Sequence, residues 1–300
     1  MVSGILLPAE KTQLFKMRLR IMNEQDVPGG LRLNTLAGWN QTAADWRRFL
    51  RNSPSGCFVM EHDGEVVGTA ATINYESHFA WIGMVLVDPE FRKQGIGTEL
   101  LKKTIEHLDA AGVRTMKLDA TPQGKPIYEK LGFEEEYEIE RWMMKRPNAK
   151  TSTQSASTCV PLSEMQRENI FQLDKELFGA DRSFLLRVLA EEAPEFELAA
   201  WEKELLHGYA FGRRGLFADH LGPWMARTRG ATERLLKEFL AASSRETVIV
   251  DCLKANSMAV ELLSAYGFAS ARSLTRMVRG PNSYPGRPEF FCAILGPEFG

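Results

Sequence analysis

VLVDPEFRKQGIGT, residues 85–98, joins an apolar run of strand length to a helix with leucines at helical spacing. Two glycines one residue apart, Gly95 and Gly97, let a backbone curl so that its N–H groups face inward. The free amides and partial positive charge of the helix N-terminus favour a phosphate at the same place. Arg92 and Lys93 add positive charge at the rim. The stretch therefore predicts a strand–loop–helix unit that binds a phosphate group.

Two familiar phosphate-binding loops do not fit this stretch. A dinucleotide-binding loop has a third glycine, and residue 100 is Leu. A Walker loop ends in G-K-[ST], which is also missing. The plain alternative is a tight strand-to-helix turn without a ligand, because short glycine patterns are common.

The chain divides at PNAKTSTQSASTCVP, residues 147–161, which is rich in Ser, Thr, Ala and Pro and has no apolar period. We predict an N-terminal domain at 1–147, a linker at 148–160 and a C-terminal domain at 161–300. Both domains show the order strand, long helix, strand, short helix, strand. LGF at 131–133 and YGF at 266–268 mark the same point in that order. The chain is therefore predicted to contain an internal duplication.

Residues 17–146 resemble the GNAT N-acetyltransferase superfamily, on the R-x-x-G-x-G loop, the leucine-rich helix after it and YEKLGF at 128–133. The second half resembles the diverged GNAT-type domain of tandem acetyltransferases. The resemblance implies an α/β fold of two tandem GNAT-like domains. Each would have a mixed, mostly antiparallel central sheet flanked by helices.

Acetyl-CoA as the acyl donor is what the resemblance implies for the loop. The backbone of the strand end would contact the pantetheine arm, through Val85, Leu86 and Val87. The loop and helix start would surround the pyrophosphate, through Arg92, Lys93, Gln94, Gly95, Ile96, Gly97 and Thr98. Thr121 stands where many family members have Asn and would bind the pantetheine through its hydroxyl.

Tyr128 matches the family tyrosine that protonates the departing CoA sulfur. A phenol with a pKa of about 10 stays protonated at neutral pH and can donate. The alternative for Tyr128 is simple packing beneath its helix. In the second half Leu263 takes this place and the R-x-x-G-x-G loop is absent, so that half is expected to be mainly structural.

No general base carries over, because Trp81 stands where several family members have an acid. Glu76, His78 and Asp119 are candidates by proximity in the chain, with surface or structural roles as the alternative. For the amine acceptor the expected contacts are Trp39, Asn40, Gln41 and His78, although a tryptophan in a helical region is more often part of a core.

Composition excludes several other classes of function. Lys and Arg number 37 against 39 Asp and Glu, and neither half is strongly basic, which argues against a nucleic-acid partner bound through phosphates. No apolar run approaches the roughly 20 residues of a membrane helix. The four cysteines form no CxxC or Cys/His cluster, so we predict no metal site and no disulfide framework. A cytoplasmic protein is expected, as a monomer that is a pseudo-dimer of two domains, or as a homodimer.

The sequence thus predicts an acetyl-CoA-dependent N-acyltransferase that moves an acetyl group to a primary amine by direct attack in a ternary complex. The active site would lie in the N-terminal domain, and the acceptor would be a small-molecule or peptide amine. Two alternatives stay open: a non-catalytic acyl-CoA sensor, and a scaffold that keeps the fold without a ligand.

Overall fold

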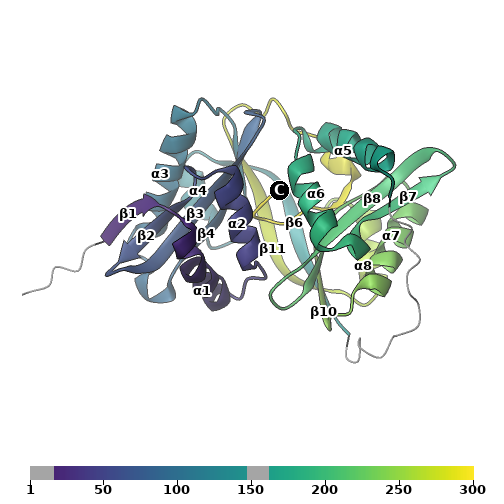
Figure 1. The fold of residues 1–300 in the computed structure, drawn as a ribbon, viewed down its shortest axis with the longest axis horizontal. Helices are drawn as coiled ribbons and strands as arrows, with labels where there is room; N and C mark the ends of the chain where they lie inside the picture. The colour runs from purple at the N-terminus through teal and green to yellow at the C-terminus, as the bar shows by residue number, and fades with distance from the viewer. Residues whose placement is uncertain (1–16, 147–161) are drawn as a thin grey trace, which may run out of the picture.

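The structure is a computed structural model that describes residues 17–146 and 162–300. The predicted linker at 148–160 lies outside the described residues. The described chain forms two α/β halves that lie side by side, with strands β6 and β11 between them (Figure 1).

The N-terminal half follows the predicted order of strands and helices. A capping box at Asn23 precedes its first helix, and a second one at Thr42 starts the next. Its elements are β1 (Met17–Ile21), α1 (Val27–Ala37), α2 (Ala43–Asn52), β2 (Phe58–His62), β3 (Glu65–Tyr75), β4 (Phe79–Val87), α3 (Ile96–Ala110), β5 (Met116–Ala120), α4 (Lys125–Lys130) and β6 (Glu134–Lys145).

The described C-terminal half repeats this order from the first helix onward, without a counterpart of β1, and ends in one additional short strand. Ser163 and Gln166 form a capping box at its first helix. Its elements are α5 (Glu164–Phe178), α6 (Ser183–Glu192), β7 (Leu198–Glu202), β8 (Leu205–Arg214), β9 (Asp219–Ala226), α7 (Arg229–Ala242), β10 (Thr247–Leu253), α8 (Ser257–Ala265), β11 (Ala269–Arg279) and β12 (Phe291–Ala293).

All twelve strands belong to one sheet, in the order β1-β2-β3-β4-β5-β11-β6-β10-β12-β9-β8-β7. The predicted tandem α/β fold with a mixed, mostly antiparallel sheet is confirmed. The finding beyond the prediction is an exchange: β11 of the C-terminal half pairs with β5, and β6 of the N-terminal half pairs with β10. Each half therefore supplies the strand that completes the sheet of the other.

Two equivalent ion pairs accompany the strand exchange. Arg276 of β11 donates to both carboxylate oxygens of Asp119 in β5, at 2.8 and 2.9 Å. Arg141 of β6 donates to both oxygens of Asp251 in β10, at 2.7 and 2.6 Å. All four side chains are almost completely buried. Bidentate pairing of this kind supplies directional contacts across both exchanged strand pairs.

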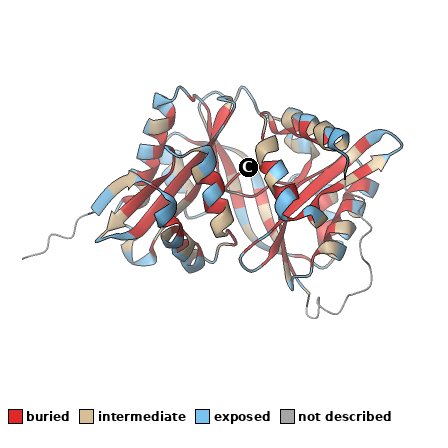
Figure 2. Ribbon diagram, viewed as in Figure 1, coloured by how far each residue is buried: buried red, intermediate tan, exposed pale blue. Residues whose placement is uncertain are grey.

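The core follows the sheet through both halves, where the strands are mostly buried and the outer helix faces are exposed (Figure 2). The predicted apolar face of α3 is buried as expected, with Leu100, Leu101, Ile105 and Leu108 turned inward. This packing fixes α3 against β3 and β4, and it therefore fixes the loop that precedes the helix.

Candidate active site

Strands β4 and β5 run side by side over two residue pairs only. Ala80 pairs with Met116 and Trp81 pairs with Lys117, both in parallel. Beyond Trp81 the edge of β4 has no partner strand, because β5 diverges from it. The divergence leaves an opening within the sheet, close to the middle of the molecule.

A bulge in β4 lies at this opening. The register with β3 shifts between Thr69 and Ala71, which face Leu86 and Gly83 respectively. Met84, inside the bulge, has a φ of 55°. Such a conformation costs a non-glycine residue on the order of 1–3 kcal/mol, and the Thr69 hydroxyl stabilises it by donating to the Met84 carbonyl at 2.8 Å.

A cavity of about 70 Å³ fills the opening between β4 and β5. Residues from both halves of the chain line it. They are Trp39, Gln41, Ile82, Gly83, Met84, Val85, Leu118, Asp119, Thr121, Tyr128, Arg272, Leu274, Pro297 and Glu298.

Tyr128 reaches the cavity from α4, which follows the end of β5. Its ring packs edge-on against Phe133, with centroids 6.1 Å apart, while its hydroxyl makes no hydrogen bond to any described residue. Burial raises the pKa of Tyr128 to about 12. The phenol is therefore protonated at neutral pH and free to donate into the cavity.

Backbone amides without acceptors lie at the other predicted part of the site, the loop between β4 and α3. Among the described residues, the N–H groups of residues 93–98 have no hydrogen-bond acceptor. No side chain caps the N-terminus of α3, which begins after Gly95 at a φ of 84°. Only glycine adopts this φ without strain, so Gly95 permits the turn that exposes the amides.

Gly97 differs from Gly95, because neither its backbone nor its surroundings require a glycine. Its φ is not in the left-handed region. A Cβ built at Gly97 would meet only Val87 Cγ2, at 3.5 Å, which is an ordinary contact. The open space beside residue 97 is therefore free for a ligand that approaches the amides.

The C-terminal half closes the equivalent opening with its own chain. Strands β9 and β10 pair over three residues, after which β12 enters between them. The hydroxyl of Thr228 caps α7 by accepting from the Ala231 amide at 3.2 Å. Leu263, at the place of Tyr128, is fully buried. In the described part of this half, β12 occupies the gap between β9 and β10, and the N-terminus of α7 is capped.

Two family models match the chain, one in each half. The acetyltransferase (GNAT) family model matches residues 24–133, and an acetyltransferase (GNAT) domain model matches residues 170–291. The chain belongs to the GNAT acetyltransferase superfamily. It is a tandem GNAT protein, as its sequence predicts.

Relatives of similar length support the same assignment. The chain is 24% identical over 247 residues to an uncharacterized N-acetyltransferase, YitH, of Bacillus subtilis, covering 82% of this chain and 86% of that protein. It is 23% identical over 263 residues to a holothin acyltransferase of a Pseudoalteromonas species, covering 87% of each. A putative acetyltransferase from Pyrococcus horikoshii has the same fold, with a TM-score of 0.76, 22% identity and coverage of 98% and 99%.

The predicted acceptor residues of this GNAT protein separate into two groups. Trp39 and Gln41 line the cavity. Asn40 does not: its amide donates to the Ala218 carbonyl at 3.1 Å and its oxygen accepts from two backbone amides of the same loop. Asn40 thus holds the α1–α2 connection against the C-terminal half and leaves its neighbours at the cavity.

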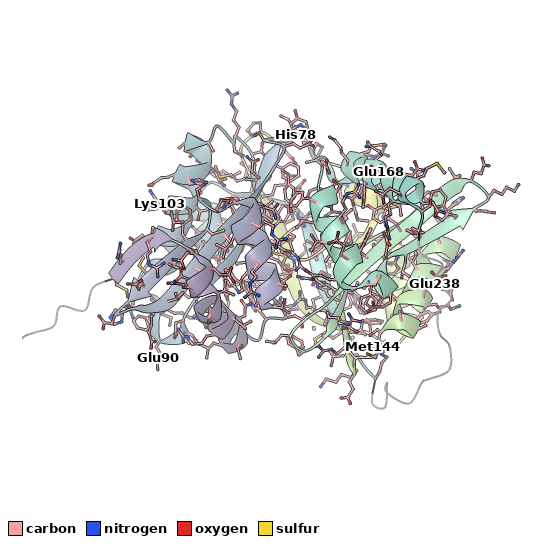
Figure 3. The ribbon with its side chains drawn as sticks, in the orientation of Figure 1. His78, Glu90, Lys103, Met144, Glu168 and Glu238 are labelled. Atoms are coloured by element: carbon pink, nitrogen blue, oxygen red, sulfur yellow. The ribbon has the colours of Figure 1, made fainter. Side chains whose placement is uncertain are left out.

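Glu76 and His78 do not line the cavity, and both lie in the turn between β3 and β4. His78 is labelled in Figure 3. Glu76 bonds to Lys175 and to the Asp181 amide, both at 2.7 Å. His78 stacks on Tyr284, with ring centroids 3.7 Å apart. These two residues form a contact between the halves.

Asp119, the third base candidate, does line the cavity, but Arg276 occupies both of its oxygens. Burial raises the pKa of Asp119, and Arg276 opposes the change. Of the predicted cofactor contacts, Val85 and Thr121 line the cavity, and the Thr121 hydroxyl also accepts from the Gly124 amide at 3.2 Å.

Two cavity residues, Arg272 and Glu298, come from the C-terminal half and escape sequence reasoning. Glu298 is 1% exposed. It forms an ion pair with Arg213 and accepts from the Gln41 amide at 2.8 Å. Nothing near these residues in the sequence marks them, because the exchanged strand β11 brings Arg272 to the N-terminal cleft and the segment after β12 brings Glu298 there.

Among residues 17–146 and 162–300, no helix has both the length and the apolar character needed to cross a bilayer. In those ranges no three His, Cys, Asp or Glu side chains gather in a way that would hold a metal ion. Cys57, Cys252 and Cys292 are free and buried, and Cys159 lies outside the described residues.

Proposed function

We propose that this protein is an acetyl-CoA-dependent N-acyltransferase with one working site, the cleft between β4 and β5. The observation that carries the proposal is the contrast between the halves. The N-terminal cleft has free amides at one end and an unbonded phenol at the other. In the C-terminal half β12 fills the corresponding opening.

The residues present fit an acyl-CoA. The amides of residues 93–98 would bind the diphosphate, with Arg92 and Lys93 exposed at the rim. The unpaired edge of β4, from Val85 to Val87, offers backbone groups to the amide-rich pantetheine arm. The bulge at Met84 would then lie beside the thioester.

Transfer needs one bond to form and one to break. The amine nitrogen attacks the thioester carbonyl carbon, the new C–N bond forms, and the C–S bond breaks as CoA leaves. Tyr128 gives its phenolic proton to the departing sulfur, a role suited to a phenol whose pKa of about 12 keeps it protonated. Because the amine attacks directly, the acceptor and the acyl-CoA occupy the cleft together.

The attacking amine must lose a proton, and we assign this proton to Glu298. Asp119 and Glu298 are the two carboxylates that line the cavity, and each has both oxygens engaged. The guanidinium of Arg276 holds both oxygens of Asp119. Glu298 has one oxygen paired with Arg213 and the other bound by the neutral amide of Gln41, and that second oxygen is the better placed acceptor for a proton.

The names of two relatives, an N-acetyltransferase and a holothin acyltransferase, support the transfer of an acyl group to nitrogen. A sensor that binds acyl-CoA without turnover would not need a free phenol at the thioester. The acceptor in this proposal is a small-molecule or peptide amine. One chain supplies every cavity residue, so no second copy is required.

Titration calorimetry with CoA, followed by thiol-release assays over an amine panel, tests the proposal. We expect one CoA bound per chain and thiol release that depends on an added amine. Binding without any amine-dependent release would favour the sensor, and no binding would favour the scaffold.

A further inference from the structure

Arg272 is a cavity residue without a partner. It lies in β11, and its side chain lines the cavity together with Tyr128 and Glu298. Its Nε atom is buried and makes no hydrogen bond. No carboxylate among the described residues lies within 4.0 Å of its guanidinium.

The buried arginines among the described residues are all compensated: each of the five, Arg48, Arg141, Arg182, Arg213 and Arg276, pairs with an aspartate. Arg272 is partly buried. A charge withdrawn from water without a partner is unfavourable, so an isolated one at a cavity needs an explanation.

The surroundings of Arg272 make its position still less favourable. It faces Arg141 directly across the β11–β6 pair, and like charges at opposite positions destabilise a sheet. Burial, together with Arg141, lowers the pKa of Arg272 to about 10. At neutral pH the guanidinium is still charged; Asp251 and Glu298 favour that charge, but among the described residues neither forms an ion pair with it.

Among the charged groups that line the cavity, only the Arg272 guanidinium has no ion-pair partner in the described residues. Arg276 balances Asp119. Glu298 is already engaged by Arg213. The amide nitrogen of Gln41 donates a hydrogen bond to Glu298. The other end of the same side chain, Oε1, is a buried acceptor without a donor. The cavity therefore offers a free acceptor for an N–H group and a free cation for an anion.

We propose that the acceptor of this enzyme is an amine that also carries a carboxylate, and that Arg272 binds this carboxylate. The inference rests on the proposed function and names the acceptor class for the same cleft. The amine would lie at Gln41 and Glu298 while the carboxylate lies at Arg272. The charged groups of CoA are assigned to the amides of residues 93–98, and its pantetheine arm is neutral, so CoA does not supply this anion.

Product binding tests the proposal without relying on turnover. Protein loaded with CoA is titrated with N-acetyl-β-alanine and a set of N-acetyl-α-amino acids, each paired with its neutral carboxamide. We expect at least one carboxylate to bind about tenfold or more tightly than its carboxamide, as a charge-assisted bidentate contact implies. Arg272→Gln should abolish this ratio and leave CoA affinity within about twofold. Arg272→Lys keeps the positive charge but loses the two parallel N–H donors of the guanidinium, so it should retain part of the preference for the carboxylate.

Arg234→Gln is the matched control, because Arg234 is exposed on α7 and pairs only with Glu238. It should leave the ratio unchanged. The proposal is overturned if no carboxylate binds better than its carboxamide, if the ratio persists in Arg272→Gln, or if that variant weakens CoA binding tenfold instead. A preserved carboxylate preference without any acetyl transfer would contradict the proposed function but not the acceptor class.

Discussion

Gly83 of β4 and Gly222 of β9 lie at the register shifts of the two halves, and the same segment of chain packs against both. Each glycine lies where its strand shifts register with the preceding strand. A Cβ at Gly83 would meet the Glu298 carbonyl oxygen at 2.7 Å, and one at Gly222 would overlap the Ile294 carbonyl. Residues 291–298 therefore pass from one cleft to the other.

The passage of this segment explains why the halves differ. As β12 it pairs with β9 and β10 and fills the C-terminal cleft. At the N-terminal cleft it forms no strand, and the Pro297 carbonyl accepts from Trp81 Nε1 at 2.9 Å. It therefore lines the N-terminal cleft without filling it, and it delivers Glu298 to the cavity.

Gly97→Ala should raise stability and weaken CoA binding in the same protein. Alanine near the start of α3 gains up to about 1 kcal/mol over glycine, and the protein itself leaves room for the Cβ. The same Cβ would obstruct a diphosphate at the amides of residues 93–98. We expect a loss of CoA affinity of about tenfold by calorimetry, together with an unchanged or higher Tm.

Gly230→Ala is the matched control for this change. Gly230 is the second residue of α7, as Gly97 is of α3, and nothing lies within 4 Å of a Cβ built there. It should stabilise the protein without affecting CoA. If both variants bind CoA as the wild type does, the loop at 93–98 is not the diphosphate site.

Tyr128→Phe should lower kcat by about 100-fold, since general acid catalysis typically contributes 10²–10⁴. CoA affinity should stay within about twofold, because the hydroxyl bonds to no described residue and the ring contact with Phe133 is kept. With a pKa of about 12, Tyr128 should cause no alkaline loss of wild-type activity below about pH 10. Wild-type turnover in the variant would remove Tyr128 from the mechanism.

Much of this site can be predicted from the sequence, because those parts depend on residues that are close together in the chain. The loop at 85–98 is predictable because glycine spacing and a helix start act within a few residues, whereas Tyr128 follows from the resemblance to the GNAT superfamily. The strand exchange is not predictable, since β5 and β6 show the same apolar pattern whichever strand lies between them. Arg272 reaches the cavity through that exchange, and Glu298 reaches it through the segment after β12.

One further feature of the sequence is repeated in both halves, an aspartate and an arginine that pair in the structure. Asp119 and Asp251 occupy equivalent places in β5 and β10, and Arg276 and Arg141 are opposite them. Paired residues of this kind, found in both halves of a repeat, indicate one structural role performed twice. The glycines and Tyr128 do not by themselves indicate this aspartate–arginine pair.

Glu298→Gln should make turnover about 100-fold slower at neutral pH, because the amide cannot accept the proton of the amine. CoA affinity should be retained, since the contacts assigned to CoA lie elsewhere in the cleft. A variant that keeps the wild-type rate would show that the proton leaves by another route.

Asp251→Asn should cost about 3–5 kcal/mol of unfolding free energy at pH 7, because it leaves Arg141 buried without its charge partner. Burial alone would raise the pKa of Asp251, but Arg141 and His220 outweigh it and hold that pKa well below its ordinary value. A lowered carboxyl pKa stabilises the fold above the unfolded value of about 3.9 and loses this effect as pH falls below it.

The difference between wild type and Asp251→Asn should therefore narrow between about pH 5 and pH 2, as measured by urea unfolding. Glu191→Gln is the control, since Glu191 is an exposed residue of α6, and it should change stability little at either pH. A difference that is the same at pH 3 and pH 7 would contradict the assigned ion pair.

A crystal structure with bound acetyl-CoA would show whether the cleft between β4 and β5 binds the acyl donor. We expect one ligand per chain, with its diphosphate on the amides of residues 93–98 and its sulfur within hydrogen-bond reach of Tyr128. A ligand bound in the C-terminal half, or a cleft between β4 and β5 that stays closed at saturating acetyl-CoA, would contradict this expectation.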